Sequence, residues 1–478
     1  MSTNDLAPSR TVPVVREIAV LLLLLALSVG LLVEFHKPAV IDPSQNKHWA
    51  AALDFYQRHD FFGIHVEDQP YLAKPPLPFW IVAAPMWILG ATPAALSLTS
   101  EVFALVLVFG TYVLGRRFFG QSAGFFAALV MLVNLILPWI TSASVIDTTA
   151  AVLVSLPLVF FYLGWRHQGR RTLFVFLYQF SSALAMCHRG PLGAILPLLT
   201  VAAVLVPLGQ WRVLAQFHNP LAVGMWLAIV VPYYVVLGAA FGHSFFMGEN
   251  IHHFLAGEPR VVRPPYFFAA ATFFRYFPWS PFSLLALVYA YRRRSGPERM
   301  ELWFLVAWLA SWFTFWNLAA ARNESYTLLV GPPIALLTGT MLAQLWRDPA
   351  AVVDTPAKRV WLFLCFFSMA MSAPALPMVT ILSKHLAFSR VVTVILTVAL
   401  VAWALVVIAL AAARRYRTAL VVGVVLVTTV GFPVTLWVRP LLYEARVERR
   451  HRKAAAAKTE PARPVVPGES AGGRAAAP

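Results

Sequence analysis

The sequence is poor in charge, and poorest in acidic charge. Only 12% of its 478 residues are charged, and 21 Asp and Glu stand against 38 Lys and Arg. Hydrophobic residues make up 59% of the chain. No water-soluble domain of this length can bury so much apolar surface. The composition therefore predicts an integral membrane protein.

Cysteine is also scarce, and the sequence shows no internal repeat. Cys187 and Cys365 lie in apolar segments far apart in the chain, which argues against a disulfide framework. The net charge of +17 could suggest a nucleic-acid partner, but the basic residues form short clusters between apolar runs. That pattern is typical of membrane orientation signals, so no nucleic-acid partner is expected.

Apolar runs of about 17–25 residues, long enough to cross a bilayer, recur along the chain. They predict an all-α polytopic membrane protein with about thirteen transmembrane helices. The predicted spans lie near 17–34, 96–115, 123–143, 148–165, 172–187, 191–208, 220–241, 267–291, 301–317, 326–346, 359–382, 390–413 and 418–438. We expect one membrane domain over residues 1–442, and a basic, Ala- and Pro-rich disordered tail over 443–478.

The basic clusters all fall on cytoplasmic loops only if one apolar run does not cross the membrane. With Arg10 and Arg16 in the cytoplasm, the run 75–90 must lie in or dip into the outer face. The first outer loop, 35–95, then carries juxtamembrane helices, including an amphipathic one around Trp49 and Tyr56. An odd number of spans places the basic tail outside, against the charge rule.

Lone charges at outer helix ends are the candidate site residues. Lys74 stands beside Pro75 in "YLAKPPLPFW", where it either snorkels or meets a lipid phosphate. Asp147 lies between two apolar runs, where it either caps a helix or faces a polar cavity. Arg189 precedes a Gly-Pro turn, as a snorkelling side chain or as a second cation of the same cavity.

Further candidates lie in the other outer segments. Arg322 and Tyr326 are four residues apart, so they share a helix face. Arg263 belongs to an arginine-rich outer loop that also carries adjacent His252 and His253, which point to different sides of a helix. Neither a metal nor a cofactor is therefore expected. With Lys47, these sparse outer cations suit a phosphate or pyrophosphate on a membrane-buried tail.

Taken together, these motifs make the sequence resemble a known family, the membrane glycosyltransferases of the GT-C fold. The resemblance is to the branch of protein O-mannosyltransferases and the lipid A aminoarabinose transferase (glycosyltransferase family 39-like). The pieces that carry it, in family order, include "YLAKPPLPFW", "GRRFFG", "SASVIDTTAAV", "HRGPLGAILPLL" and "RNESYTLLVGPP".

The resemblance implies an inverting transfer of a sugar from a polyprenyl-phosphate donor to a protein, lipid or glycan on the outer face. By position, Lys74 looks like the lysine that contacts the lipid phosphate, and Asp147 resembles the second acid of the catalytic site. Arg189, Arg322 and Tyr326 match further basic and tyrosine positions. The implied location is a bacterial inner membrane, among membrane lipids, with the site facing the periplasm.

One departure from the family concerns the catalytic base. Where the family has an Asp-Glu pair, this chain has Ser44-Gln45, followed by Lys47 and His48. Either Asp42 or Asp147 would then have to supply the carboxylate.

Two alternatives to a transferase stay open. The first is a catalytically degenerate protein that binds polyprenyl phosphates, which the missing acidic pair favours. The second is a lipid transporter, although transporters usually carry inverted repeats and mid-membrane charges.

Overall fold

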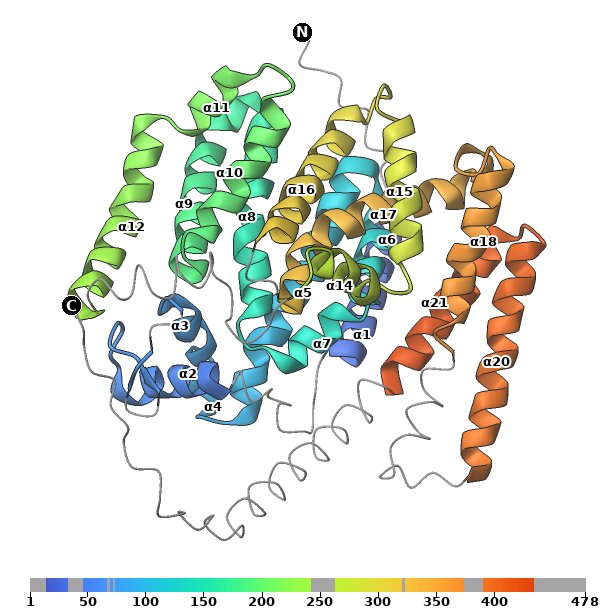
Figure 1. Cartoon of the computed structure of the whole chain (residues 1–478), viewed down its shortest axis with the longest axis horizontal. Helices are drawn as coiled ribbons and strands as arrows, with labels where there is room; N and C mark the ends of the chain where they lie inside the picture. The colour runs from blue at the N-terminus through green and yellow to red at the C-terminus, as the bar shows by residue number, and fades with distance from the viewer. Residues whose placement is uncertain are drawn as a thin grey trace, which may run out of the picture.

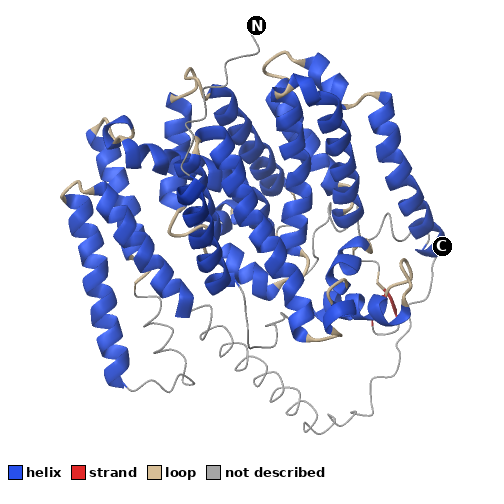
Figure 2. Ribbon diagram, turned by 180° about the vertical axis from the view of Figure 1, so that it is seen from behind, coloured by secondary structure: helices blue, strands red, loops and turns tan. Residues whose placement is uncertain are grey.

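The computed structural model describes residues 14–32, 46–66, 69–71, 74–241, 263–319, 323–373 and 390–433. Almost all of this part of the chain is helical, and most helices run side by side between two ends of the molecule (Figures 1 and 2). The predicted tail, 443–478, lies outside the described residues.

The elements follow one another in a simple order. The helices are α1 (Val14–Leu32), α2 (Asn46–Arg58), α3 (Leu77–Ala83), α4 (Met86–Leu89), α5 (Pro93–Phe119), α6 (Gln121–Leu132), α7 (Ile136–Ala143), α8 (Asp147–Arg166), α9 (Arg171–Arg189), α10 (Leu192–Leu205), α11 (Trp211–Phe217), α12 (Pro220–Phe241), α14 (Phe267–Arg275), α15 (Ser280–Arg292), α16 (Arg299–Leu318), α17 (Gly331–Arg347), α18 (Pro356–Ala370), α20 (Arg390–Ala412) and α21 (Tyr416–Pro433). Short 3-10 turns are η1 (Gln168–Arg170), η3 (Glu324–Val330) and η4 (Pro349–Ala351). Strands β1 (His65–Val66) and β2 (Gln69–Pro70) pair antiparallel, with Val66 opposite Gln69.

Five of the described helical segments are long and apolar enough to cross a membrane. They are Val14–Leu32, Ala94–Phe119, Asp147–Arg166, Pro220–Ala239 and Glu324–Arg347. Shorter apolar helices lie beside them, among them Gln121–Leu132 and Leu192–Leu205. The prediction of an all-α chain with several apolar helices is confirmed, and the number thirteen stays a prediction.

Two predicted spans are wrong as single helices. The run 123–143 breaks at Asn134, whose side-chain oxygen accepts hydrogen bonds from the backbone N–H groups of Ile136 and Leu137, at 3.0 and 2.8 Å. An Asn side chain that replaces backbone partners in this way ends one helix and starts the next. The run 267–291 breaks between α14 and α15, where Pro278 and Pro281 cannot donate a backbone hydrogen bond.

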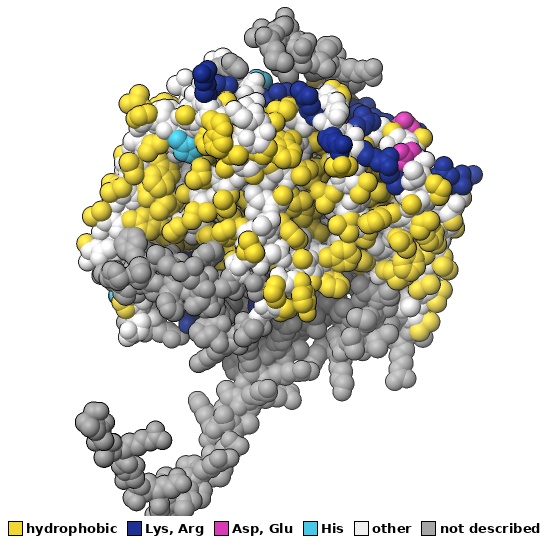
Figure 3. Space-filling view, turned by 45° about the horizontal axis from the view of Figure 1, so that its top comes forward, with side chains coloured by type: hydrophobic (Ala, Val, Ile, Leu, Met, Phe, Trp, Pro, Cys, Tyr) yellow, Lys and Arg dark blue, Asp and Glu magenta, His cyan; other side chains and the backbone are white. Residues whose placement is uncertain are grey.

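One end of the helical array is basic. There Arg116 pairs with Glu17 at 3.0 Å, and Arg292 pairs with Asp354 at 2.6 Å. Figure 3 shows Lys and Arg side chains gathered along this edge, above a broad hydrophobic surface. The opposite end carries α2, α3 and α4 (Figure 1). We call these the basic end and the α2 end.

The α2 end holds a small unit with its own apolar core. Phe55 and Phe79 are fully buried within it, and Trp80 donates its indole N–H to the carbonyl of Phe61 at 2.9 Å. Helices α3 and α4 have seven and four residues, so neither can cross a bilayer of about 30 Å. The expectation that residues 75–90 do not span the membrane agrees with this geometry.

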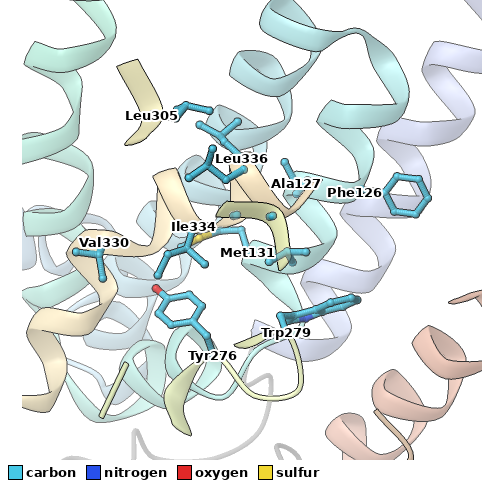
Figure 4. Close-up of a cluster of buried hydrophobic side chains, with 14 of the residues drawn as sticks. Phe126, Ala127, Met131, Tyr276, Trp279, Leu305, Val330, Ile334 and Leu336 are labelled. Carbon is cyan, nitrogen blue, oxygen red and sulfur yellow. The ribbon is translucent and has the colours of Figure 1, made fainter. Parts of the chain in front are cut away.

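The centre of the array depends on close contact between α6 and α17. Ala127 and Met131 on α6 pack against Ile334 and Leu336 on α17, with Tyr276 below them (Figure 4). Gly339 on α17 lies so close to α6 that an added Cβ would stand 2.3 Å from the backbone nitrogen of Ala127. A glycine is therefore required at this crossing.

Adding one methyl group tests this contact. Gly339→Ala should lower the free energy of unfolding by about 1–3 kcal/mol, the usual cost of overpacking, because the two helices must separate. Gly110→Ala is the matched control, since a Cβ at Gly110 meets nothing within 4 Å. Thermal unfolding in detergent measures both. Equal melting temperatures for the two variants would contradict the close crossing.

Candidate functional site

A buried ion pair joins the start of α8 to the end of α9. Asp147 is the first residue of α8, Arg189 is the last of α9, and an Arg189 guanidinium nitrogen lies 2.5 Å from Asp147 Oδ1. Their side chains are only 7% and 9% exposed. The helices are antiparallel, so the acid lies at a positive helix end and the base at a negative one, and both are stabilised there.

The turn after Arg189 holds the pair in position. Gly190 ends α9 with φ near +70°, a conformation that a residue with a Cβ rarely adopts. A Cβ on Gly193 would lie 2.1 Å from the carbonyl oxygen of Ala185, so α9 and α10 pack too closely there for any side chain. The sequence "RGPLG" thus builds a sharp turn that keeps Arg189 at the α2 end.

The second oxygen of Asp147 is also engaged. The Ser144 hydroxyl donates to Asp147 Oδ2 at 2.7 Å, and the Ser144 carbonyl accepts from the Ser100 hydroxyl at 2.9 Å. Asp147 is therefore fixed between α9, the turn before α8, and α5. A carboxylate held in this way orients its arginine rather than moving freely.

Lys74 is followed by Pro75 and Pro76, a proline corner that hydrogen bonds attach to α9. The backbone N–H of Leu77 donates to the Tyr233 hydroxyl at 3.0 Å, and that hydroxyl donates to the carbonyl of Cys187 on α9 at 3.0 Å. Pro76 opens α3 without leaving an unpaired N–H in its first turn. The corner is therefore attached to α9 two residues before Arg189, and the charge of Lys74 acts on both His48 and His188.

His48, from the first turn of α2, belongs to the same group. Its ring lies 6.2 Å from the ring of Tyr71 and 6.1 Å from that of Phe79, measured between centroids. Burial lowers the pKa of His48 from 6.5 to about 4; the positive charges of Lys74 and Arg189 lower it as well, while Asp147 opposes them. The imidazole is therefore neutral at neutral pH.

Tyr326 closes the group from the side of η3. The guanidinium carbon of Arg189 lies 5.4 Å from the centroid of the Tyr326 ring, a cation–π distance. The ring itself packs on Trp316, with 4.2 Å between centroids. Arg189 is thus held by Asp147 on one side and by an aromatic face on the other.

The predicted site residues divide into three sets. Lys74, Asp147, Arg189 and Tyr326 come together at the α2 end. Lys47 is exposed on α2, and the guanidinium of Arg263 lies over Phe267 at 4.4 Å, so their part in the site stays a prediction. The third set, Asp42, Arg322, His252 and His253, lies outside the described residues, as do Ser44 and Gln45.

Sequence reasoning missed two features of this end. His48 was adjacent to a candidate cation, but nothing in the pattern placed its ring beside Asp147. Arg275 pairs with Glu324, two residues before Tyr326, and its guanidinium lies 4.0 Å from the centroid of Trp139. The acidic residue within "RNESY" was the only available signal for this second pair.

The site carries the electrostatics of an anion-binding group. Lys74 and Arg189 bring two positive charges, Asp147 brings one negative charge, and His48 is neutral. Among the residues that the structure describes, no three His, Cys, Asp or Glu side chains gather in a way that could hold a metal ion.

The family model of dolichyl-phosphate-mannose-protein mannosyltransferases matches residues 73–236, which include Lys74, Asp147 and Arg189. Two similar curated proteins are undecaprenyl phosphate-alpha-4-amino-4-deoxy-L-arabinose arabinosyl transferases. The one from Yersinia enterocolitica is 24% identical, over 62% of this chain and 54% of that protein. The one from Pectobacterium carotovorum is 25% identical, over 72% of this chain and 62% of that protein. The chain thus matches little more than half the length of these relatives.

A solved structure decides the fold. The crystal structure of ArnT from Cupriavidus metallidurans, bound to undecaprenyl phosphate, matches 94% of this chain and 80% of its own, with a TM-score of 0.70 and 16% identity. The chain has the GT-C fold. The fold that the sequence motifs implied is thereby confirmed, and this arrangement brings Lys74, Asp147, Arg189 and Tyr326 to one end of the helices.

The Asp147–Arg189 pair gives a stability prediction. Arg189→Gln should lower the free energy of unfolding by about 3–5 kcal/mol, because it leaves a buried carboxylate without its counter-charge. The double variant Asp147→Asn/Arg189→Gln should be more stable than Arg189→Gln alone. Denaturant unfolding in detergent measures both.

The control is the exposed pair Arg292–Asp354, in which the side chains are 51% and 45% exposed. Arg292→Gln should change stability by no more than about 1 kcal/mol. Asp147→Asn alone completes the cycle, and a double variant whose loss equals the sum of the two single losses would show that the side chains do not interact.

Proposed function

We propose that this chain is a membrane glycosyltransferase that takes a sugar from a polyprenyl-phosphate donor. The observation that carries the proposal is the convergence of Lys74, Asp147, Arg189 and Tyr326 from four separate elements. The acceptor is a protein, lipid or glycan hydroxyl or phosphate at the same membrane face.

A lipid phosphate fits this group better than a soluble anion. The cations lie at the ends of apolar helices, and α12, α5 and α1 expose apolar side chains on their outer surfaces. An isoprenoid tail would lie along such surfaces while its phosphate reaches Lys74 and Arg189. The relatives' names and the ArnT complex point to undecaprenyl phosphate as the carrier.

In the proposed reaction, an acceptor oxygen displaces the phosphate from the sugar in one inverting step. Negative charge grows on the departing phosphate, and Lys74 and Arg189 stabilise it there. Asp147 holds the Arg189 guanidinium in place through the 2.5 Å contact. Asp42 stays a candidate carboxylate from the loop before α2.

The charge distribution supports an outward-facing site. Basic side chains gather at the end opposite α2, and such clusters mark the cytoplasmic side of membrane proteins (Figure 3). We therefore place the α2 end on the outer face, which in a bacterial inner membrane is the periplasmic side.

A second candidate is a protein that binds polyprenyl phosphate without turnover. Ser44 and Gln45 stand where a carboxylate pair is expected, and both oxygens of Asp147 are engaged. A transfer assay separates the two. Purified protein is incubated with radiolabelled undecaprenyl-phosphate sugars, aminoarabinose and mannose included, and with hydroxyl-bearing and phosphate-bearing acceptors. We expect label in at least one acceptor; binding of undecaprenyl phosphate with no transfer to any acceptor would favour the second candidate.

Lys74 gives a sharper test of donor binding. Lys74→Ala removes one charge-assisted contact to the phosphate, so the donor KM should rise by about 10- to 100-fold. Lys358→Ala is the control, since Lys358 is a largely buried lysine paired with Asp354 at the basic end. If Lys74→Ala leaves both the donor KM and undecaprenyl phosphate binding unchanged, Lys74 does not contact the donor.

A further inference from the structure

The described site leaves the proton of an acceptor hydroxyl without an obvious destination. Asp147 Oδ1 is occupied by Arg189 at 2.5 Å, and Oδ2 accepts from Ser144 at 2.7 Å. Drawing the proton to Asp147 would break the contact that orients the phosphate-binding arginine. In the segment just before α2, Ser44 and Gln45 stand where a carboxylate pair is expected and neither is a base, while Asp42 lies outside the described residues.

His48 lies where such a base is needed. It is the third residue of α2, half-buried, and its ring packs against those of Tyr71 and Phe79, which also contact each other at 5.5 Å between centroids. Helix α2 packs on α3, which begins three residues after Lys74. This aromatic cluster restricts the ring, and a base with a fixed orientation is the kind that proton transfer requires.

We propose that His48 is the general base that accepts the proton of a hydroxyl acceptor, an inference that rests on the proposed function. The acceptor oxygen forms a bond to the anomeric carbon as the bond from that carbon to the phosphate oxygen breaks. The phosphate leaves with the bonding electron pair, and the hydroxyl proton moves to a ring nitrogen of His48. The imidazolium then releases this proton to water, so no other reactant is needed.

The charges around His48 suit this role. Three groups act on it: Lys74 from the corner before α3, Asp147 from α8 and Arg189 from α9. Burial and the two cations keep the ring neutral, so it is ready to take a proton at neutral pH. With its lowered pKa, His48 is about as basic as the carboxylates that act as general bases in other enzymes. When the proton arrives, Asp147 and the departing phosphate stabilise the imidazolium.

Two substitutions at this position isolate proton acceptance from shape. Gln and Glu have nearly the same size, but only Glu is a base. With undecaprenyl-phosphate sugars and a hydroxyl acceptor, His48→Gln should lower kcat by about 10²- to 10⁴-fold. The donor KM should stay near that of the wild type. His48→Glu should recover part of the lost rate.

The pH profile and the acceptor provide independent readouts. In the wild type, kcat should fall as the pH drops toward the pKa of His48, where the ring becomes protonated; this acidic limb should disappear in His48→Gln. A phosphate-bearing acceptor is already ionised, so His48→Gln should barely change its rate. His59→Asn, on an exposed histidine that follows α2, serves as the control and should behave like the wild type.

The outcomes separate this inference from the proposed function. Transfer to hydroxyl acceptors that survives in His48→Gln would overturn the role of His48 alone. So would equal losses with hydroxyl and phosphate acceptors, since these indicate a structural role. Transfer by the wild type to phosphate acceptors only would also overturn it while leaving the glycosyltransferase intact. A wild type that binds undecaprenyl phosphate but transfers to neither acceptor would overturn the proposed function itself.

Discussion

The buried pairing of Asp147 with Arg189 is the constraint on which the site depends. Two charges that are less than a tenth exposed must satisfy each other, so the start of α8 and the end of α9 cannot move independently. The neighbouring elements are arranged around this pair: Ser144 and Ser100 behind the acid, and Tyr326 over the guanidinium. Arg189 therefore stands preorganised toward the α2 end, which is the property that stabilises a developing phosphate charge most effectively.

The rest of the fold supplies what the pair needs. Gly339 lets α6 and α17 pack closely at the centre, and ion pairs join helix termini at the basic end. Figure 4 shows Ala127 and Met131 beside Ile334 and Leu336 in this region. The α2 unit covers the site from outside the helical array and contributes His48 and Lys74 (Figure 1). The chain thus separates the basic end from the end that carries the candidate site.

Much of this arrangement could be predicted from the sequence, for identifiable reasons. Apolar runs are local features of the sequence, so they predicted the helical membrane class. Lone charges at helix ends are local as well, and they identified Lys74, Asp147 and Arg189 as candidates. The resemblance supplied the fold and the order of the motifs. The breaks at Asn134 and around Pro278 were missed because hydropathy averages over a run and does not register a side chain that replaces backbone hydrogen bonds. His48 was missed because the charges that surround it belong to residues 26 to 141 positions away, which no spacing rule encodes.

If the proposed function is right, an isoprenoid phosphate binds between Lys74 and Arg189 at the α2 end. A cryo-EM map of the protein in nanodiscs saturated with undecaprenyl phosphate would locate it. We expect phosphate density within hydrogen-bonding distance, about 3 Å, of the Lys74 ammonium and the Arg189 guanidinium. Phosphate density at the basic end, with the space between Lys74 and Arg189 filled by protein side chains, would contradict it.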